Sequence, residues 1–164
     1  MIGGLLAPRD AALGLGSNLG DKAANIARAV ALIAARGVLG PLTVSALYRS
    51  PPWGGVAQDW FVNACIAGDA LVSPEDLLRA CLDIEAQMGR VRAERWGPRL
   101  IDIDVLYVGD SARATLALTL PHPHMTTRAF VLRPLAQIRP ELEIDGRGIA
   151  AMAAQFGTHE AEAF

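Results

Sequence analysis

Two carboxylates separated by one residue give the strongest chemical signal in the chain. Asp102 and Asp104 lie within the otherwise apolar segment 100–108. If this segment is a strand, alternate residues share a face, so both side chains point the same way. Neighbouring carboxylates repel each other unless a cation or proton lies between them, and paired oxygen ligands suit Mg²⁺, which takes its other ligands from water and substrate phosphates. The alternative is a solvated strand face or ion pairs with arginines.

The segment directly before this pair is rich in arginine. Four arginines occur there, namely Arg90, Arg92, Arg95 and Arg99. The glycines and proline among them exclude regular structure throughout, so the segment is expected to be a loop. Guanidinium groups beside a metal site are what phosphoryl or nucleotidyl transfer requires, because charge on the phosphate oxygens must be compensated. Trp96 could close such a site against water, or pack at the base of the loop.

Two other groups of residues suit a small-molecule ligand. Phe61 and Asn63 share a face of an expected strand, which places an aromatic ring beside an amide and suits a flat heterocycle. The alternative is a buried ring and an amide that satisfies backbone groups. His122 and His124 flank a proline, but no third soft metal ligand is apparent. Hydrogen bonding of a phosphate or ribose is the preferred interpretation for one of them.

Hydrophobic periodicity and turn residues divide the chain into strands and helices. The expected strands cover residues 11–15, 42–50, 60–67 and 100–108, and the expected helices cover about 22–37 and 74–89. This order of strand, helix, strand, strand, helix, strand is the ferredoxin-like βαββαβ plan, of class α+β.

The last third of the chain predicts a second helical layer. A hairpin is expected at 109–118, followed by a short helix that Thr126 or Thr127 caps and Pro134 interrupts or restarts. This helix would cover the other sheet face and give a three-layer α/β/α sandwich. The chain shows no repeat or linker, so we expect a single domain over residues 1–164 with its motif-bearing core at about 11–140.

Composition narrows the class of protein and its partners. The 164 residues are 52% apolar and 20% charged, with a net charge of −2, which is typical of a folded domain and excludes a disordered chain. The balance of charge gives no reason to expect nucleic acid or an acidic membrane as partner. Cys65 and Cys81 lie in apolar segments without metal-binding spacing, which favours buried thiols. With no signal peptide or membrane span apparent, we expect a cytoplasmic protein.

A set of ordered motifs resembles a known enzyme family. The motifs are LGSNLGD, YRSPPWG, FVNA, GRVRAERWGPRLIDIDVL and LPHPHMTTRAFVLRPL. Together they resemble the 6-hydroxymethyl-7,8-dihydropterin pyrophosphokinases of folate biosynthesis, over a span from about Leu13 to Pro140. The resemblance implies transfer of pyrophosphate from ATP to the hydroxymethyl group of the pterin, with release of AMP, on a ferredoxin-like sandwich.

The resemblance also implies roles for individual residues. Asp102 and Asp104 would be the ligands of two Mg²⁺ ions. One of them could accept the hydroxyl proton, or the metals alone could lower the pKa of the hydroxyl sufficiently. The implied catalytic set is Arg90, Arg99, Asp102 and Asp104. Further ATP contacts would be Arg92, Trp96, His122 and Arg128. The pterin pocket would comprise Ser50, Pro51, Trp53, Phe61, Asn63 and Phe130. We expect a monomer that acts on these two small molecules.

Departures from the family pattern are few, and two other functions stay open. Some members have an additional Lys in the arginine loop, so it is open which loop cation contacts which phosphate. Some have a Tyr where Pro123 stands, so it is also open whether His124 or a backbone group replaces that hydroxyl. One alternative is another two-metal nucleotidyl-transfer enzyme, which the lack of a basic nucleic-acid surface disfavours. The other is a non-catalytic pterin or nucleotide binder, which loss of Asp102, Asp104 or Arg99 would favour.

Overall fold

The computed structural model describes residues 9–52, 59–89 and 99–164. The core elements are β1 (Arg9–Ser17), α1 (Lys22–Arg36), β2 (Thr43–Val44), β3 (Tyr48–Ser50), β4 (Phe61–Ala70), α2 (Pro74–Gln87) and β5 (Asp102–Val108). They are followed by β6 (Arg113–Ala114), β7 (Thr119–Leu120), the 3₁₀ turn η1 (Met125–Thr127) and α3 (Ala129–Ile138). The chain ends with β8 (Glu143–Ile144), β9 (Arg147–Gly148), α4 (Ile149–Ala154), η2 (Thr158–Glu160) and β10 (Glu162–Ala163).

Strand β1 is the centre of the main sheet. It pairs antiparallel with β4 on one side, from Arg9 opposite Ala70 to Ser17 opposite Val62, and with β5 on the other. In the described residues the strand order is β10-β3-β4-β1-β5, with β2 also paired to β4. The expected βαββαβ plan is therefore confirmed, with β1, β3, β4 and β5 as its strands.

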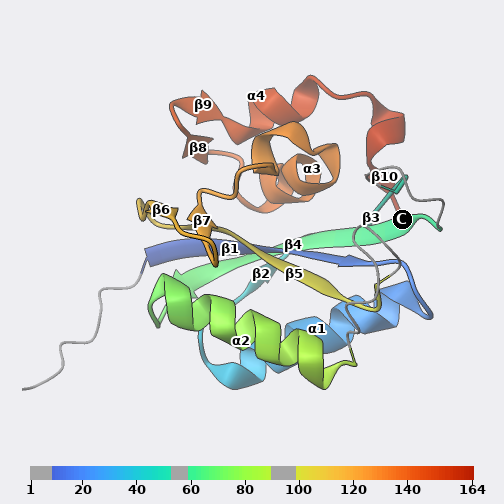
Figure 1. The fold of residues 1–164 in the computed structure, drawn as a ribbon. Helices are drawn as coiled ribbons and strands as arrows, with labels where there is room; N and C mark the ends of the chain where they lie inside the picture. The colour runs from blue at the N-terminus through green and yellow to red at the C-terminus, as the bar shows by residue number, and fades with distance from the viewer. Residues whose placement is uncertain (1–8, 53–58, 90–98) are drawn as a thin grey trace, which may run out of the picture.

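Helices cover both faces of this sheet. Figure 1 shows α1 and α2 on one face and α3 with α4 on the other, which confirms the expected three layers. The α1/α2 side buries residues such as Leu13, Ile33, Ile66, Leu77 and Ile84. The α3/α4 side buries a second apolar cluster that includes Leu106, Leu132, Leu135 and Ile149. Among the described residues no helix combines the length and apolar character needed to cross a bilayer.

The ends of the first two helices follow from local turn chemistry. Asp21 accepts a hydrogen bond from the Ala24 N–H at 3.1 Å and caps α1, which ends at Gly37 with a φ of 64°. That backbone conformation favours glycine because it has no Cβ. Ser73 accepts from the Asp76 N–H at 3.1 Å to cap α2, and Pro74 occupies its first turn.

A register irregularity in β5 changes the direction of its later side chains. Ala12 pairs with Tyr107 while Leu13 pairs with Val105, so Leu106 is an additional residue opposite β1. Tyr107 therefore joins Leu106 in the α3/α4 cluster, and Val108 packs on the α1/α2 side. Strict alternation would have placed Tyr107 on the α1/α2 side instead.

The single strand expected at 42–50 is wrong, because it is divided into β2 and β3. Between them, the Ser45 hydroxyl accepts from the Cys65 N–H at 2.9 Å and donates to the Ala46 carbonyl at 2.7 Å. A side chain thus replaces one ladder bond and lets the strand bend. The hairpin expected at 109–118 extends to Leu120, since Arg113 pairs with that residue.

The expectation for the later helix is also corrected. Thr126 and Thr127 lie in η1 and do not cap α3, whose first turn bonds instead to the Arg128 carbonyl through Val131 and Leu132. Pro134 lies inside α3 without interrupting it, although proline removes one backbone donor. The tail after Gly148, in which the sequence shows no clear pattern, contributes β10, which pairs with β3 at the sheet edge.

A polar cluster ties the end of α3 to the start of β1. The Tyr107 hydroxyl donates to Asp10 Oδ2 at 2.6 Å, and Arg139 donates to Asp10 Oδ1 from Nε at 3.1 Å and from Nη2 at 3.0 Å. Burial and the hydrogen bond to Asp10 raise the pKa of the Tyr107 hydroxyl, so it remains a donor. The cluster fixes one end of the α3 layer against the sheet.

We predict that Tyr107→Phe lowers the free energy of unfolding by about 1.5 kcal/mol, because the hydrogen bond of the hydroxyl to the charged, partly exposed Asp10 is lost while Arg139 stays bonded to that carboxylate. Urea unfolding followed by circular dichroism measures the change. Tyr48→Phe is the matched control, since that hydroxyl bonds Gln137 at an exposed position. Equal losses in the two variants would contradict the importance of the Asp10 cluster.

Candidate active site

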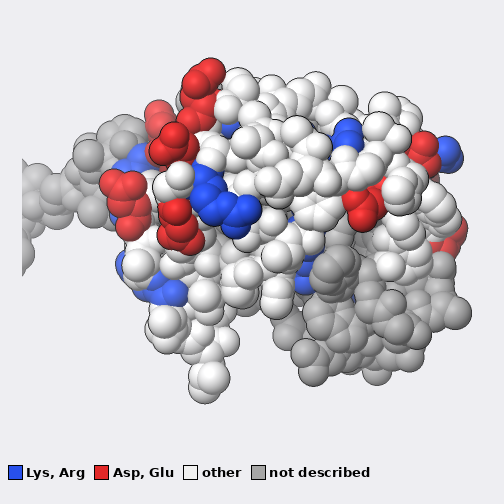
Figure 2. All heavy atoms as spheres, turned by 90° about the horizontal axis from the view of Figure 1, so that it is seen from above, with Lys and Arg blue, Asp and Glu red and all other residues white. Residues whose placement is uncertain are grey.

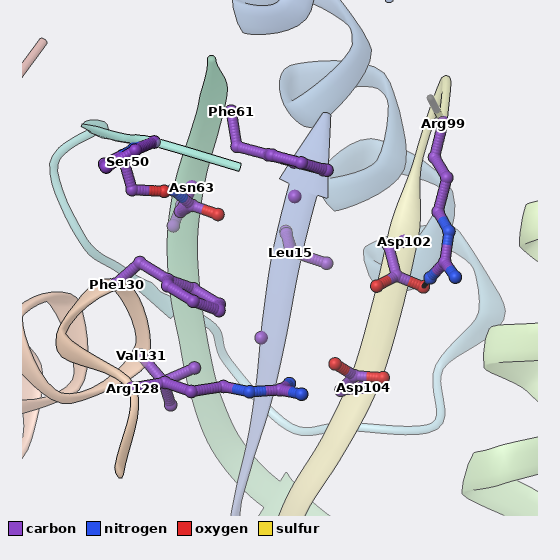
Figure 3. Close-up of a pocket in the computed structure, with 14 residues that line it drawn as sticks. Leu15, Ser50, Phe61, Asn63, Arg99, Asp102, Asp104, Arg128, Phe130 and Val131 are labelled. Carbon is purple, nitrogen blue, oxygen red and sulfur yellow. Dashed lines mark hydrogen bonds and ion pairs between the residues drawn. The ribbon is translucent and has the colours of Figure 1, made fainter. Parts of the chain in front are cut away.

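A hollow on the α3 side of the sheet brings most of the predicted site residues together. The glycine-containing segment Gly14–Gly16 of β1 forms part of its lining, between β4 and β5. Nine predicted residues also line this first hollow: Ser50, Pro51, Phe61, Asn63, Arg99, Asp102, Asp104, Arg128 and Phe130. Figure 3 shows aromatic and amide groups at one end and charged groups at the other. The hollow therefore suits a ligand that is flat at one end and polar at the other.

Two rings and an amide form the uncharged end. Phe61 extends from β4 and Phe130 from α3, and they lie on either side of Asn63 (Figure 3). Asn63 is buried and donates from Nδ2 to Ser50 Oγ at 2.8 Å. A Cβ at Gly16 would lie 3.3 Å from Asn63 Oδ1 and 3.7 Å from Phe61, so the missing side chain keeps this end open. An aromatic ligand could insert here and hydrogen-bond the amide.

The charged end is built around the carboxylate pair of β5. Asp102 and Asp104 point into the hollow, as strand alternation predicts, and their side chains are 25% and 37% exposed. Arg99 Nη1 lies 3.0 Å from Asp102 Oδ1. Arg128 reaches from the start of α3 toward Asp104 (Figure 3). Two cations thus flank two anions that are partly open to a ligand.

Arg128 connects the two ends of the hollow. Only 8% of its surface is exposed, and its guanidinium carbon lies 5.6 Å from the centre of the Phe130 ring. Burial lowers the pKa of the Arg128 guanidinium, whereas the charges of Asp104 and Asp102 raise it. An arginine keeps its charge under these conditions, so it can serve as a fixed donor to an anion.

A second hollow adjoins the first at the carboxylates. Its apolar wall includes Leu78 and Leu82 of α2 and Leu116 and Leu118 near the β6–β7 hairpin. Arg99, Asp102 and Asp104 line both hollows. The carboxylate pair therefore marks the border between two binding spaces.

His122 lies in the second hollow and faces the border. Its Nε2 is 4.0 Å from Asp104 Oδ2, and its Nδ1 accepts from the His124 N–H at 3.1 Å. Burial, followed by the nearby Arg128 and His124, lowers the pKa of His122 to about 4. The imidazole is thus neutral near pH 7 and carries its proton on Nε2, where it can donate to a phosphate oxygen.

The residues at the border fit a hard divalent cation. The described segments hold no group of three His, Cys, Asp or Glu side chains with metal-binding geometry. Asp102 and Asp104 nevertheless offer carboxylate oxygens that open to both hollows, and Mg²⁺ commonly uses one or two carboxylates plus water and phosphate. His124 does not line either hollow, so the alternative of a metal-binding histidine pair gains no support.

Four predicted site residues cannot be placed, and two kinds of residue escaped prediction. Trp53, Arg90, Arg92 and Trp96 lie outside the described residues. Leu78 and Leu82 gave no chemical signal because they resemble ordinary apolar helix positions. Asn18 was predicted only as part of a turn, but it is buried and hydrogen-bonded to the segments that carry the site. The available signal for Asn18 was its place in the sequence, because it is a polar residue that directly follows an apolar strand.

Comparison with known proteins relates the chain to one family. The sequence model of 7,8-dihydro-6-hydroxymethylpterin-pyrophosphokinase (HPPK) matches residues 12–140. A 2-amino-4-hydroxy-6-hydroxymethyldihydropteridine pyrophosphokinase of Methylorubrum extorquens is 53% identical over 137 residues, covering 84% of this chain and 87% of the relative. A protein of the same name from Pseudomonas aeruginosa is 42% identical over 141 residues, covering 85% and 87% of the two chains.

Solved structures support the fold. The wild-type Plasmodium falciparum HPPK-DHPS bound to pteroate superposes with a TM-score of 0.71 at 16% identity and covers 91% of this chain. This chain spans 44% of that longer protein. The likeness extends to the layered α+β architecture.

For the metal-free protein we predict that His122 stays neutral, with its proton on Nε2, down to about pH 5. Burial disfavours the charged imidazole, so a pKa of about 4 leaves the neutral form in excess at that pH. Long-range ¹H–¹⁵N NMR reports the tautomer, and the His122→Gln variant identifies its signals. A titration midpoint above pH 6 would contradict this description of the site.

Proposed function

The chain belongs to the 7,8-dihydro-6-hydroxymethylpterin-pyrophosphokinase family, and on this premise we propose how its residues perform the reaction. The enzyme transfers the pyrophosphoryl group of ATP to hydroxymethyldihydropterin in folate biosynthesis. The single observation that carries the assignment of residues is that Asp102 and Asp104 lie at the border of two hollows. Pterin would occupy one hollow and ATP the other, so the transferred group would cross the border.

The first hollow is the proposed pterin site. Phe61 and Phe130 would contact the two faces of the ring system, and Asn63 would bind its hydrogen-bonding edge. Ser50 fixes the position of that amide, and Pro51 contributes to the wall. The hydroxymethyl group would then extend toward Asp102 and Asp104. Trp53 remains a predicted part of this pocket from the sequence.

The second hollow is the proposed ATP site. Its leucine-rich wall suits the apolar faces of the base, and the His122 Nε2–H can donate to a phosphate oxygen. Arg99 and Arg128 approach the border from different elements, so they can hold the triphosphate on two sides. Arg90, Arg92 and Trp96 remain predicted contributors from the segment before Arg99.

These contacts support in-line displacement at the β-phosphorus. The pterin hydroxyl oxygen forms the new P–O bond, the bond from the β-phosphorus to the AMP oxygen breaks, and AMP leaves. Asp102 and Asp104 would hold two Mg²⁺ ions, which neutralise triphosphate charge and lower the pKa of the attacking hydroxyl. One of the carboxylates would accept the hydroxyl proton if the metals alone do not suffice, while the arginines would orient the phosphates.

Several properties complete the proposal. We place the activity in a monomer with a single domain that acts on these two small molecules in the cytoplasm. Cys65 and Cys81 are both buried and outside any disulfide, which agrees with a reducing compartment. On the face seen in Figure 2, the described part is mostly uncharged and its basic side chains are mixed with acidic ones, so this face gives a nucleic acid no continuous basic surface.

The reaction is tested by coupled detection of AMP formed from ATP and Mg²⁺, with and without 6-hydroxymethyl-7,8-dihydropterin. Pterin-dependent AMP that disappears in Asp102→Ala supports both the activity and the carboxylate role. Pterin binding without AMP would instead favour a non-catalytic binder, and release of pyrophosphate would favour nucleotidyl transfer.

We predict that Asp104→Ala lowers kcat by at least about 100-fold while pterin binding remains measurable, because a metal ligand acts on the phosphates rather than on the pterin ring. Steady-state kinetics and a pterin fluorescence titration separate the two effects. Asp110→Ala, which removes an exposed carboxylate beyond the end of β5, is the control. Near-normal turnover of Asp104→Ala would remove the metal-ligand assignment.

We predict that Gly16→Ala weakens pterin binding by about 10-fold, since the new Cβ would lie 3.3 Å from Asn63 Oδ1 and force the amide to move. Fluorescence titration measures the dissociation constant. Gly148→Ala meets no atom within 4 Å and serves as the control. An unchanged dissociation constant for Gly16→Ala would place the pterin elsewhere.

A further inference from the structure

We propose that Asn18 is a positioning residue that holds the walls of the two binding hollows in register. Asn18 follows β1 in the turn before α1, and only 3% of its surface is exposed. It does not line either hollow. It instead bonds the chain just before β4 and just before β5, which carry the pterin and phosphate residues respectively.

The contact with Arg99 has two hydrogen bonds. The Arg99 N–H donates to Asn18 Oδ1 at 2.7 Å, and the Asn18 N–H donates to the Arg99 carbonyl at 3.0 Å. The last registered pair between β1 and β5 is Gly16 opposite Asp102. Asn18 therefore extends the connection between β1 and β5 beyond the last pair of the regular ladder. Its side-chain oxygen accepts the Arg99 N–H in the place that a backbone carbonyl takes in a ladder. This fixes the peptide from which the Arg99 side chain reaches Asp102.

The contact with Asp59 joins the pterin side. Asn18 Nδ2 donates to the Asp59 carbonyl at 3.3 Å, two residues before Phe61 in the sequence. Asp59 is also held by Lys22, whose Nζ lies 2.8 Å from Asp59 Oδ2. The start of β4 is thereby attached to the turn that contains Asn18. Arg99, which lies just before β5, is attached to the same turn.

The orientation of the Asn18 amide is determined by its backbone partners. The Arg99 N–H can only donate and the Asp59 carbonyl can only accept, so Oδ1 must face Arg99 and Nδ2 must face Asp59. An aspartate at position 18 would keep the acceptor for Arg99 but would place an oxygen against the Asp59 carbonyl. The two contacts can therefore be separated by substitution.

This arrangement predicts an effect on catalysis that passes through Arg99. A displacement of about 1 Å at a phosphate-binding group can lower a rate by about 100-fold. The inference rests on the phosphate role proposed for Arg99. If Asn18 acts by positioning that residue, its removal should matter little once the Arg99 guanidinium is absent.

The test is a double-mutant cycle of Asn18→Ala and Arg99→Ala, with kcat and KM measured for both substrates. We expect Asn18→Ala to lower kcat by about 10- to 100-fold in the natural chain and by less than about 3-fold in the Arg99→Ala background. Asn18→Asp should keep more of kcat than Asn18→Ala, while it weakens pterin binding through the start of β4. Equal fold losses of kcat in the two backgrounds would overturn the proposal.

Asn25→Ala is the matched control within the same turn. Asn25 Nδ2 bonds Ser17 Oγ and the Leu19 carbonyl at 3.2 and 2.8 Å, without a contact to Arg99 or Asp59. An equal kcat loss in Asn25→Ala would mean that turn stability, rather than Asn18, causes the effect, and would overturn the proposal.

Amide hydrogen exchange of the ligand-free protein provides a readout independent of activity. Asn18→Ala should remove protection at the Arg99 N–H while the amides of the β1–β5 ladder keep theirs. Retained protection at Arg99 would contradict its positioning by Asn18. Failure of the phosphate role is distinguishable, because Arg99→Ala alone would then leave kcat unchanged.

Discussion

The pairing of β1 with strands on both of its sides is the constraint on which the rest of the structure depends. Its ladder sets β4 and β5 at fixed register, so the Phe61–Asn63 face and the Asp102–Asp104 face open toward the same side. Only small residues of β1 lie between them at positions 14 and 16, which leaves space for a ligand. The α1/α2 core packs against the opposite face of this strand through Leu13 and Leu15.

Electrostatic balance is the second requirement of the site. Two carboxylates on one strand face would repel each other in a dry interior. Here partial exposure to solvent and flanking guanidinium groups reduce that repulsion. His122 adds a neutral donor rather than a further charge. The result is a partly open border at which carboxylates, guanidinium groups and a neutral imidazole lie close together.

Sequence patterns predicted the elements whose signals are local. Period-two alternation identified the direction of Asp102 and Asp104, and capping residues located both ends of α1 and the start of α2. The irregularity at Leu106 and the division of the second strand depend on cross-strand partners such as Cys65, so no local pattern revealed them. The positions of Asn18 and the α2 leucines beside the site likewise depend on residues distant in the sequence. The family resemblance, rather than periodicity, supplied the substrates.

The last strand of the sheet has a consequence for how this chain behaves among its own copies. β10 occupies the outer side of β3, where backbone groups would otherwise be available to another strand. It is two residues long, and Glu162 forms an ion pair with Arg49 at 3.1 Å across the pairing. Short, charged edge strands discourage the addition of further strands. β10 therefore shields the β3 edge of the sheet from pairing with a strand of another copy of this chain.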